Sequence, residues 1–205
     1  MKGSADQTLE RPEPRPRRDA TRARICAAAR EVFLKEGYAA ATMEQIAARA
    51  GVRRSTLYNH FRDKNEILAA VSDDYLEGVL EVIALLPGPR PSRRQIDRWL
   101  ADFADFVLQE RAPTMLILQF TAGFDAPPAT REFGMRMMNG LAARVPAFAE
   151  ALEPGRRQAY ARATTVIREL GIALGHHLEE EGRGNAPYML EVAGDLLEQF
   201  VKGWF

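Results

Sequence analysis

The sequence predicts an all-α protein. Apolar residues recur at three- and four-residue steps along the chain, as at Ile25, Ala28, Ala29, Val32 and Phe33. We find no stretch of useful length in which apolar and polar residues alternate, which a half-buried strand would require. Proline- and glycine-rich segments interrupt the helical pattern at intervals. We therefore expect about three short helices followed by about six longer ones.

The first two helices are delimited by capping signals. Asp19 can cap the start of the first helix, and Gly37 can end it in a left-handed conformation. Thr42 and Gln45 form a T-x-x-Q capping box that starts the second helix, and Gly51 ends it. Both helices are therefore predicted with defined starts and ends.

A third short helix follows after only two or three residues. Leu57 and Phe61, four residues apart, are expected to face inward. Two short helices joined by a tight glycine turn are typical of a helix-turn-helix. If Leu57 and Phe61 point inward, Arg54, Ser55, Tyr58 and Asn59 lie on the outward side.

Asp63 and Glu66 form a D-x-x-E box that starts a long fourth helix, which "PGPRPS" at 87–92 ends. Further helices are expected at about 94–111, 113–122, 129–144, 155–182 and 187–204, with Pro146 read as a breaker. The expected domains are a disordered basic arm at 1–18, a helix-turn-helix domain at 19–66, and a helical regulatory and dimerisation domain at 67–205.

Charge is distributed unevenly along a chain of 205 residues whose formal net charge is zero. Through Glu66 there are fourteen Lys or Arg against nine Asp or Glu, and from Ile67 onward there are fourteen against nineteen. Such asymmetry favours an anionic partner for the first part, often nucleic acid. Cys26 is the single cysteine, so an intramolecular disulfide and a cysteine-based metal cage are excluded. We expect no cofactor, no metal, no membrane span and a cytoplasmic location.

Residues 25–68, "ICAAAREVFLKEGYAAATMEQIAARAGVRRSTLYNHFRDKNEIL", closely resemble the DNA-binding region of the tetracycline-repressor (TetR) family of transcriptional regulators. The matching positions include Phe33, Gly37 and Thr42, the run Ala50-Gly51-Val52, and the run Thr56-Leu57-Tyr58 followed by His60-Phe61 and Lys64. The chain departs from the family pattern at Arg53, where the family usually has Ser or Thr as the cap of the recognition helix. Arginine cannot accept the unpaired backbone N–H bonds. Either Ser55 caps instead and shifts the start, or the start of the helix is less firmly fixed.

The chemistry of the outward side chains agrees with a DNA-binding helix. Arg54 could pair bidentately with a guanine and Asn59 with an adenine in the major groove. Thr56 and Tyr58 can reach phosphate oxygens or a thymine methyl group, and Thr42 and Lys64 begin helices, where phosphate is favoured. The resemblance also puts Tyr58 and His60 at the DNA backbone. The predicted DNA-binding residues are Thr42, Arg53, Arg54, Ser55, Thr56, Tyr58, Asn59, His60 and Lys64.

The remaining two-thirds of the chain carries predictions that rest partly on the resemblance. Family members commonly bind a small molecule in this domain, and Met and aromatic residues suit an apolar pocket, although they equally suit a core. The predicted pocket residues are Trp99, Phe103, Phe106, Met115, Leu118, Gln119, Phe124, Met135, Met138 and Arg168. The last two helices carry apolar seams that predict either a dimer interface or an internal core. These seams comprise Tyr160, Thr164, Ile167, Gly171, Leu174, Leu178, Met189, Ala193, Leu196 and Phe200.

The resemblance implies a transcriptional regulator, by the usual mode of the family a repressor. It would bind a near-palindromic operator in double-stranded DNA as a homodimer and be released by a small apolar or aromatic ligand. One alternative is a DNA-binding protein that needs no ligand. Another is a helical enzyme, but His176 and His177 are adjacent and point about 100° apart on a helix, which makes them poor metal co-ligands.

Overall fold

The computed structural model describes residues 15–121 and 127–203, and these residues form ten helices and no strand. The all-α prediction is confirmed. The helices, in chain order, are α1 (Arg15–Glu36), α2 (Met43–Ala50), α3 (Arg54–His60), α4 (Lys64–Ala84), α5 (Arg93–Gln109), α6 (Arg111–Thr121), α7 (Pro128–Ala142), α8 (Pro146–Ala151), α9 (Arg157–Glu180) and α10 (Ala186–Lys202).

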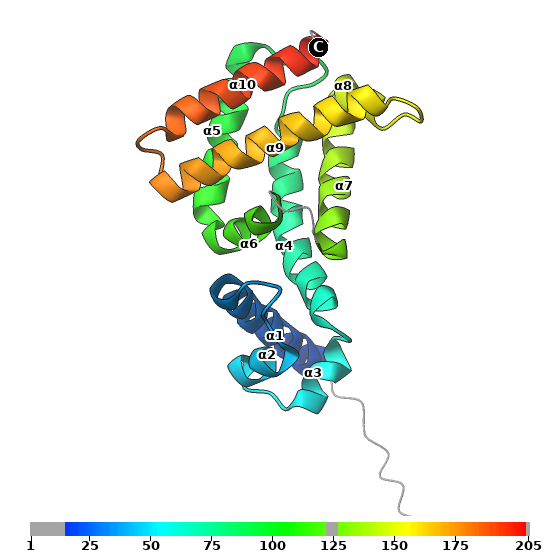
Figure 1. Cartoon of the computed structure of the whole chain (residues 1–205), viewed down its shortest axis with the longest axis vertical. Helices are drawn as coiled ribbons and strands as arrows, with labels where there is room; N and C mark the ends of the chain where they lie inside the picture. The colour runs from blue at the N-terminus through cyan, green and yellow to red at the C-terminus, as the bar shows by residue number, and fades with distance from the viewer. Residues whose placement is uncertain (1–14, 122–126, 204–205) are drawn as a thin grey trace, which may run out of the picture.

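The helices form a small group at the N-terminus and a larger group joined to it by α4. Figure 1 shows α1, α2 and α3 together at one end of the molecule, and α9 and α10 side by side across the other end. The long helix α4 leads from the small group into the larger one, with α5, α6 and α7 around it (Figure 1). This arrangement puts the predicted recognition helix far from the two last helices.

The N-terminal group has its own hydrophobic core. The predicted stripe of α1 is buried there, as are Ile46 and Ala47 of α2 and Leu57 of α3. Leu116 of α6 and Ala129 of α7 also belong to this core. The N-terminal group is therefore packed directly against two helices of the larger group.

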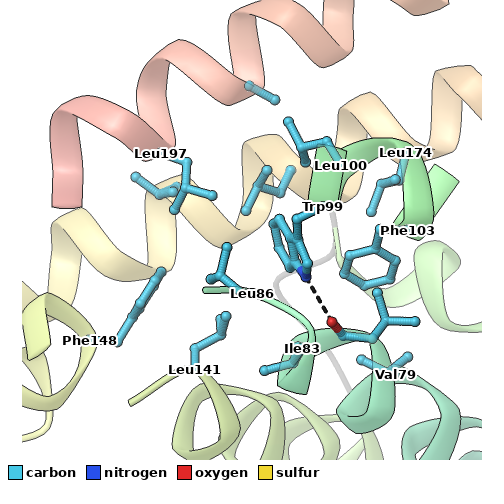
Figure 2. Close-up of a cluster of buried hydrophobic side chains, with 14 of the residues drawn as sticks. Val79, Ile83, Leu86, Trp99, Leu100, Phe103, Leu141, Phe148, Leu174 and Leu197 are labelled. Atoms are coloured by element: carbon cyan, nitrogen blue, oxygen red, sulfur yellow. Dashed lines mark hydrogen bonds between the residues drawn. The ribbon is translucent and has the colours of Figure 1, made fainter. Parts of the chain in front are cut away.

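The larger core surrounds Trp99 of α5. The Trp99 indole Nε1 donates a 2.8 Å hydrogen bond to the Val82 carbonyl oxygen in α4, as Figure 2 shows. Leu86 lies beside it, and Leu174 of α9 and Leu197 of α10 belong to the same cluster of buried side chains (Figure 2). Because a buried indole N–H normally needs a partner, this bond fixes α5 against α4.

The capping signals place the helix ends well. Thr42 and Gln45 form the predicted reciprocal box, and Gly51 has a φ of 63°. Gly37 has a φ of 79° and donates its backbone N–H to the Phe33 carbonyl oxygen. Asp63 accepts from the Glu66 backbone N–H at 2.8 Å, but the Glu66 carboxylate accepts from the Arg62 N–H instead of closing the box.

Two expectations about the helices were wrong. Helix α1 begins at Arg15, so Asp19 lies inside the helix and residues 15–18 are its first turn rather than part of a disordered arm. The rest of that arm, 1–14, lies outside the described residues. Pro146 does not break a helix but begins α8, because the missing N–H of proline costs nothing in a first turn.

Candidate nucleic-acid interface and internal cavity

Helix α3 presents one side to the core and the other to solvent. Leu57 and Phe61 are fully buried, as the sequence predicted. Arg53, Arg54, Ser55, Tyr58 and Asn59 are exposed, and Thr56 and His60 are half-buried. The outward set expected from the spacing is therefore on one accessible face, and its contact with DNA stays a prediction.

The start of α3 is fixed despite the unusual residue at its N-cap. Arg53 is the N-cap, with an extended backbone and no side-chain hydrogen bond to the helix. The helix begins at Arg54, so Ser55 does not take over as a cap. The Arg53 carbonyl oxygen still accepts the first helical bond, from the Leu57 N–H at 3.0 Å. The register is thus set by the inward packing of Leu57 and Phe61 rather than by a capping hydroxyl.

Arg54 is held in position by two neighbours. Its guanidinium lies 2.8 Å from the Glu44 carboxylate of α2, and its Cζ lies 5.5 Å from the centre of the Tyr58 ring. The three side chains are exposed, so the ion pair is worth little in free energy. Its effect is to hold the guanidinium on the outward face, where a guanine could replace Glu44 as the acceptor.

Lys64 has partners that the sequence did not predict. Its ammonium donates to the carbonyl oxygens of Tyr38, Ala39 and Ala41, at 2.7, 2.9 and 3.2 Å. It also lies 4.6 Å from the centre of the Tyr38 ring. Because an ammonium has three N–H donors, these bonds leave none for a phosphate. The geometry argues for a structural role and against the phosphate contact expected for this residue.

A cavity of about 280 Å³ lies within the larger helical group, between α4, α5, α6, α7 and α9. Of the predicted pocket residues, Trp99, Phe103, Leu118 and Arg168 line it. The sequence missed the contributions of α4 and of the first turn of α7, which include Tyr75, Val79, Ile83, Thr130 and Arg131. Their apolar members sit in ordinary helical stripes, which carry no signal that separates a cavity wall from a core.

The other predicted pocket residues lie elsewhere. Phe106 stacks on the Tyr75 ring at 5.5 Å and fills the space beside Gly78 rather than the cavity. Met138 is buried in the core, and Gln119 and Met135 are exposed. Met115 is half-buried and does not line the cavity, whereas Met137 does. Phe124 lies outside the described residues.

The deepest polar groups of the cavity wall are two hydroxyls. The Tyr75 and Thr114 hydroxyl oxygens lie 2.9 Å apart in a hydrogen bond. Burial raises the pKa of Tyr75 to about 12, against a smaller lowering by the bond to Thr114. The phenol therefore stays neutral over the physiological range, as an apolar wall requires.

The apolar seams predicted on α9 and α10 are mostly internal. Leu174 and Leu178, and likewise Ala193 and Phe200, are buried within this one chain. Thr164, Ile167 and Gly171 line the cavity together with Leu174. Tyr160 is exposed, while Met189 and Leu196 are half-buried. For the four buried residues the internal-core alternative was correct, because each points back into the helices that α9 and α10 cover.

A different set of apolar side chains is exposed on the same two helices. Tyr188 and Val192, one turn apart on α10, are 67% and 55% exposed, and Ile172 on α9 is also exposed. Helices α9 and α10 pack against each other. We call Ile172, Tyr188 and Val192 the α9–α10 outer face. Tyr188 and Val192 are four residues apart, as are Ala193 and Leu197 among the buried residues of α10, so spacing alone did not single them out.

In the part of the chain that the structure describes, no group of three or more His, Cys, Asp or Glu side chains is placed to hold a metal ion. Within 15–121 and 127–203, no helix is both long and apolar enough to cross a membrane.

Comparison with known proteins points to one family. Residues 25–71 match the family model described as bacterial regulatory proteins, tetR family. The HTH-type transcriptional activator FasR of Mycolicibacterium smegmatis is 34% identical over 103 residues, which cover 50% of this chain and 47% of FasR. The matched segment thus spans about half the length of that relative.

Solved structures share the fold at low sequence identity. A TetR family transcription regulator from Marinobacter aquaeolei VT8 superposes with a TM-score of 0.61 at 18% identity, over 91% of this chain and 98% of that one. The multidrug binding protein EbrR, complexed with imidazole, superposes with a TM-score of 0.55 at 21% identity, over 85% and 93% of the two chains. The resemblance inferred from residues 25–68 is confirmed.

Proposed function

We propose that this chain regulates transcription by binding a specific DNA operator through α3, because residues 25–71 match the tetR family of bacterial regulatory proteins and the chain has the fold of such regulators. It binds as a dimer to a near-palindromic site and is released by a small apolar or aromatic ligand in the cavity. FasR and the Marinobacter protein are transcriptional regulators, which are not enzymes. FasR is named an activator; for this chain we propose repression, because release by a ligand then turns transcription on.

One observation carries the DNA-binding proposal. Helix α3 is held by the buried Leu57 and Phe61, and its opposite side carries exposed Arg54, Tyr58 and Asn59. An α-helix fits the major groove with residues near its N-terminus against base edges. Arg54 stands at the first position of α3, where it can reach a guanine, and Asn59 lies more than one turn further on.

The proposed dimer uses the α9–α10 outer face. Exposed apolar groups gathered on one face are typical of protein–protein interfaces. Two-fold symmetry would put α9 and α10 of each subunit against those of the other and give two copies of α3 for two half-sites. A single seven-residue helix contacts few bases, so a dimer would provide the specificity that one subunit lacks.

The proposed release works through Phe120 of α6. Phe120 lines the cavity, and its ring lies edge-on to Tyr38 of the α1–α2 loop at 5.7 Å. Tyr38 in turn contacts Lys64, the first residue of α4, through its carbonyl oxygen and its ring. A ligand that displaces Phe120 would therefore act on the loop and helix that hold α3. The size of the effect equals the difference in ligand affinity between the DNA-competent and incompetent states.

A second link runs between α7 and the start of α4. The backbone N–H of Ala129 donates to the Asn65 Oδ1 at 3.2 Å, and Ala129 is part of the N-terminal core. Thr130 and Arg131, the next two residues, line the cavity. Movement of the first turn of α7 would thus be felt at both the cavity and the DNA-binding group.

The test is selection of bound DNA from a random pool, followed by titration of the selected duplex and a scrambled duplex. The unaltered protein should enrich a near-palindromic sequence. An Arg54→Ala, Asn59→Ala double variant should lose about 1–3 kcal/mol of discrimination for each contact. The matched control is Arg49→Ala, since Arg49 is also exposed but belongs to α2 and pairs with Glu31 of α1. Full discrimination in the double variant would refute the proposed register.

A further inference from the structure

Two opposite charges from different helices meet beside the outward side of α3. Glu44 lies in the first turn of α2, where the Thr42–Gln45 capping box fixes the start of the helix. Its carboxylate lies 2.8 Å from the guanidinium of Arg54, the first residue of α3, and both side chains are exposed. An acidic side chain thus touches the residue that is proposed to read a guanine.

The packing of the two helices keeps this contact within reach. Ile46 of α2 and Leu57 of α3 are fully buried in the N-terminal core, so the two backbones keep their separation. Tyr58, about one turn after Arg54, places its ring centre 5.5 Å from the Arg54 Cζ on the other side. When the guanidinium reaches a base edge, the Glu44 carboxylate can therefore follow it within hydrogen-bond distance.

A carboxylate at this position has an electrostatic cost on DNA. The phosphates repel it, so it weakens binding to a duplex of any sequence. Its favourable interaction with the dipole at the start of α2 is present with or without DNA and does not offset that cost. The cost is offset where the carboxylate meets a hydrogen-bond donor of the DNA. In the major groove the bases present two such donors, the cytosine N4 and adenine N6 amino groups.

The edge of a G·C base pair offers the matching groups at a matching distance. Guanine O6 accepts and cytosine N4 donates, and the hydrogen bond between these two atoms makes them about 2.9 Å apart. The guanidinium of Arg54 and the carboxylate of Glu44 are a donor and an acceptor 2.8 Å apart. Arginine has five N–H donors, so two can turn to guanine O6 and N7 while another stays with Glu44. The carboxylate keeps lone pairs for the cytosine amino group.

We propose that Glu44 is a specificity-determining residue, which accepts a hydrogen bond from cytosine N4 in the base pair whose guanine Arg54 contacts. This deepens the proposed function and rests on it, since it requires α3 in the major groove. Glu44 and Arg54 together read the orientation of that pair. In the reversed C·G pair the amino group faces the guanidinium and the keto oxygen faces the carboxylate, so both contacts become repulsive.

The experiment uses the full chain and the duplex that it selects from a random pool. Arg54→Ala identifies the base pair that Arg54 contacts, because the preference relaxes at that position. All four base pairs are then compared there by fluorescence anisotropy at one salt concentration, with the unaltered protein and with Glu44→Ala. G·C should bind best, and its reversal should weaken binding by the unaltered protein about 25-fold or more. Glu44→Ala should reduce this penalty at least about fivefold.

A modified base tests the hydrogen bond itself. N4-methylcytosine still pairs with guanine, but it carries a methyl group in place of the amino hydrogen that faces the major groove. At the identified position it should weaken binding by the unaltered protein about fivefold or more, and binding by Glu44→Ala less than about twofold. If Glu44 merely steadied Arg54, the methyl group would cost both proteins the same, and that result overturns the inference.

Glu31→Ala is the matched control. Glu31 of α1 is exposed and pairs with Arg49 of α2, so this variant also removes one negative charge from an ion pair between two helices. It should keep the full penalties for the reversed pair and for N4-methylcytosine. Loss of either penalty in Glu31→Ala would reflect a general effect of charge and overturn the assignment to Glu44.

The outcomes separate this inference from the proposed function. If Arg54→Ala relaxes one base pair and Glu44→Ala leaves its selectivity unchanged, the proposed function stands and the inference fails. The inference also fails if the base pair that Arg54 contacts is not G·C. If no sequence is enriched from the pool, both fail.

Discussion

Lys64 shows how much a single side chain can do for the position of the DNA-binding group. Its ammonium satisfies three backbone carbonyl oxygens of the loop between α1 and α2. These carbonyls follow the end of α1, and the lysine that binds them lies 23 to 26 positions further along the chain. The lysine therefore ties the first residue of α4 to the loop that precedes α2.

We predict that Lys64→Met lowers the free energy of unfolding by about 1.5–3 kcal/mol, because hydrogen bonds from a charged donor are lost while the aliphatic stem is kept. Thermal unfolding with chemical denaturation measures this. Lys35→Met is the control, since Lys35 is exposed and pairs with its sequence neighbour Glu36, and it should change stability by less than about 0.5 kcal/mol. Unchanged stability in Lys64→Met together with weaker DNA binding would instead support a phosphate contact.

Tyr75 gives the protein a pH dependence in the alkaline range. Its pKa is raised by burial from 10 to about 12, so between these values the unfolded chain releases a proton that the folded chain keeps. The contribution of Tyr75 to the free energy of unfolding is therefore fully present below pH 10 and is lost as the pH rises toward 12. We predict that unfolding temperature falls less steeply over pH 10–12 in Tyr75→Phe than in the unaltered protein. Parallel curves would show that Tyr75 ionises as readily when folded as when unfolded.

At the scale of single residues, sequence reasoning succeeded where the partner is near in the chain. The Thr42–Gln45 box and the inward packing of Leu57 and Phe61 follow from spacings of three and four. It did not find the three carbonyl partners of Lys64, because nothing in a local pattern shows which distant carbonyls an ammonium will reach. The start of α3 at Arg54 became clear only with the structure.

At the scale of helices, the sequence predicted which segments are helical and about where each helix ends. It did not predict what each face of a helix contacts. The five helices predicted after residue 92 lie within about two residues of α5, α6, α7, α9 and α10. Helix α9 has apolar side chains that face the core, the cavity and the solvent in turn. Periodicity identifies that such a helix is amphipathic, and only the positions of its neighbours decide what each face meets.

Helix α6 is the element on which the proposed release depends. We predict that Tyr38→Leu, which removes the ring contact with Phe120 but leaves the cavity wall intact, reduces the effect of ligand on DNA affinity. Coupling between two sites is typically about 1–3 kcal/mol, so we expect the ligand to weaken operator binding about 10-fold or more in the unaltered protein. In the Tyr38→Leu variant the same ligand should change operator affinity less than about 3-fold. Operator titrations with and without 2-naphthoate as the aromatic ligand, on the unaltered protein and on the variant, measure the two fold-changes in affinity.

The control for this prediction is Met43→Leu, a volume-conserving change within the same N-terminal core. It should preserve the coupling. If Tyr38→Leu keeps full coupling while its ligand affinity is unchanged, the signal travels by the Asn65–Ala129 bond or another route, and not through Phe120.

At the scale of the whole molecule, α4 joins the two hydrophobic cores. Its first part packs in the N-terminal core and the rest packs in the larger one. The expected domain boundary after Glu66 thus falls inside a continuous helix and stays a prediction. The fold class and the family were accessible from sequence because they rest on many local features together, whereas the cavity depends on five helices meeting in space.

The α9–α10 outer face leads to a prediction about assembly. A Tyr188→Glu, Val192→Glu double variant should be monomeric by light scattering at micromolar concentration, because like charges would face each other across the two-fold axis. Its affinity for a palindromic operator should fall accordingly. Leu85→Glu is the control, since Leu85 is 60% exposed but follows the end of α4 and belongs to neither α9 nor α10. A dimeric double variant, or a monomeric unaltered protein, would contradict the assignment.

The way α3 is anchored has a practical consequence. The side chains that hold the helix, Leu57 and Phe61, are different from those that face outward, and the N-cap contributes no side-chain bond that constrains its neighbours. Positions 54, 55, 58 and 59 can therefore be randomised as a library without rebuilding the core. Such a library, screened against chosen duplexes, would make this chain a scaffold whose target sequence and chemical trigger are altered independently, one on α3 and the other in the cavity.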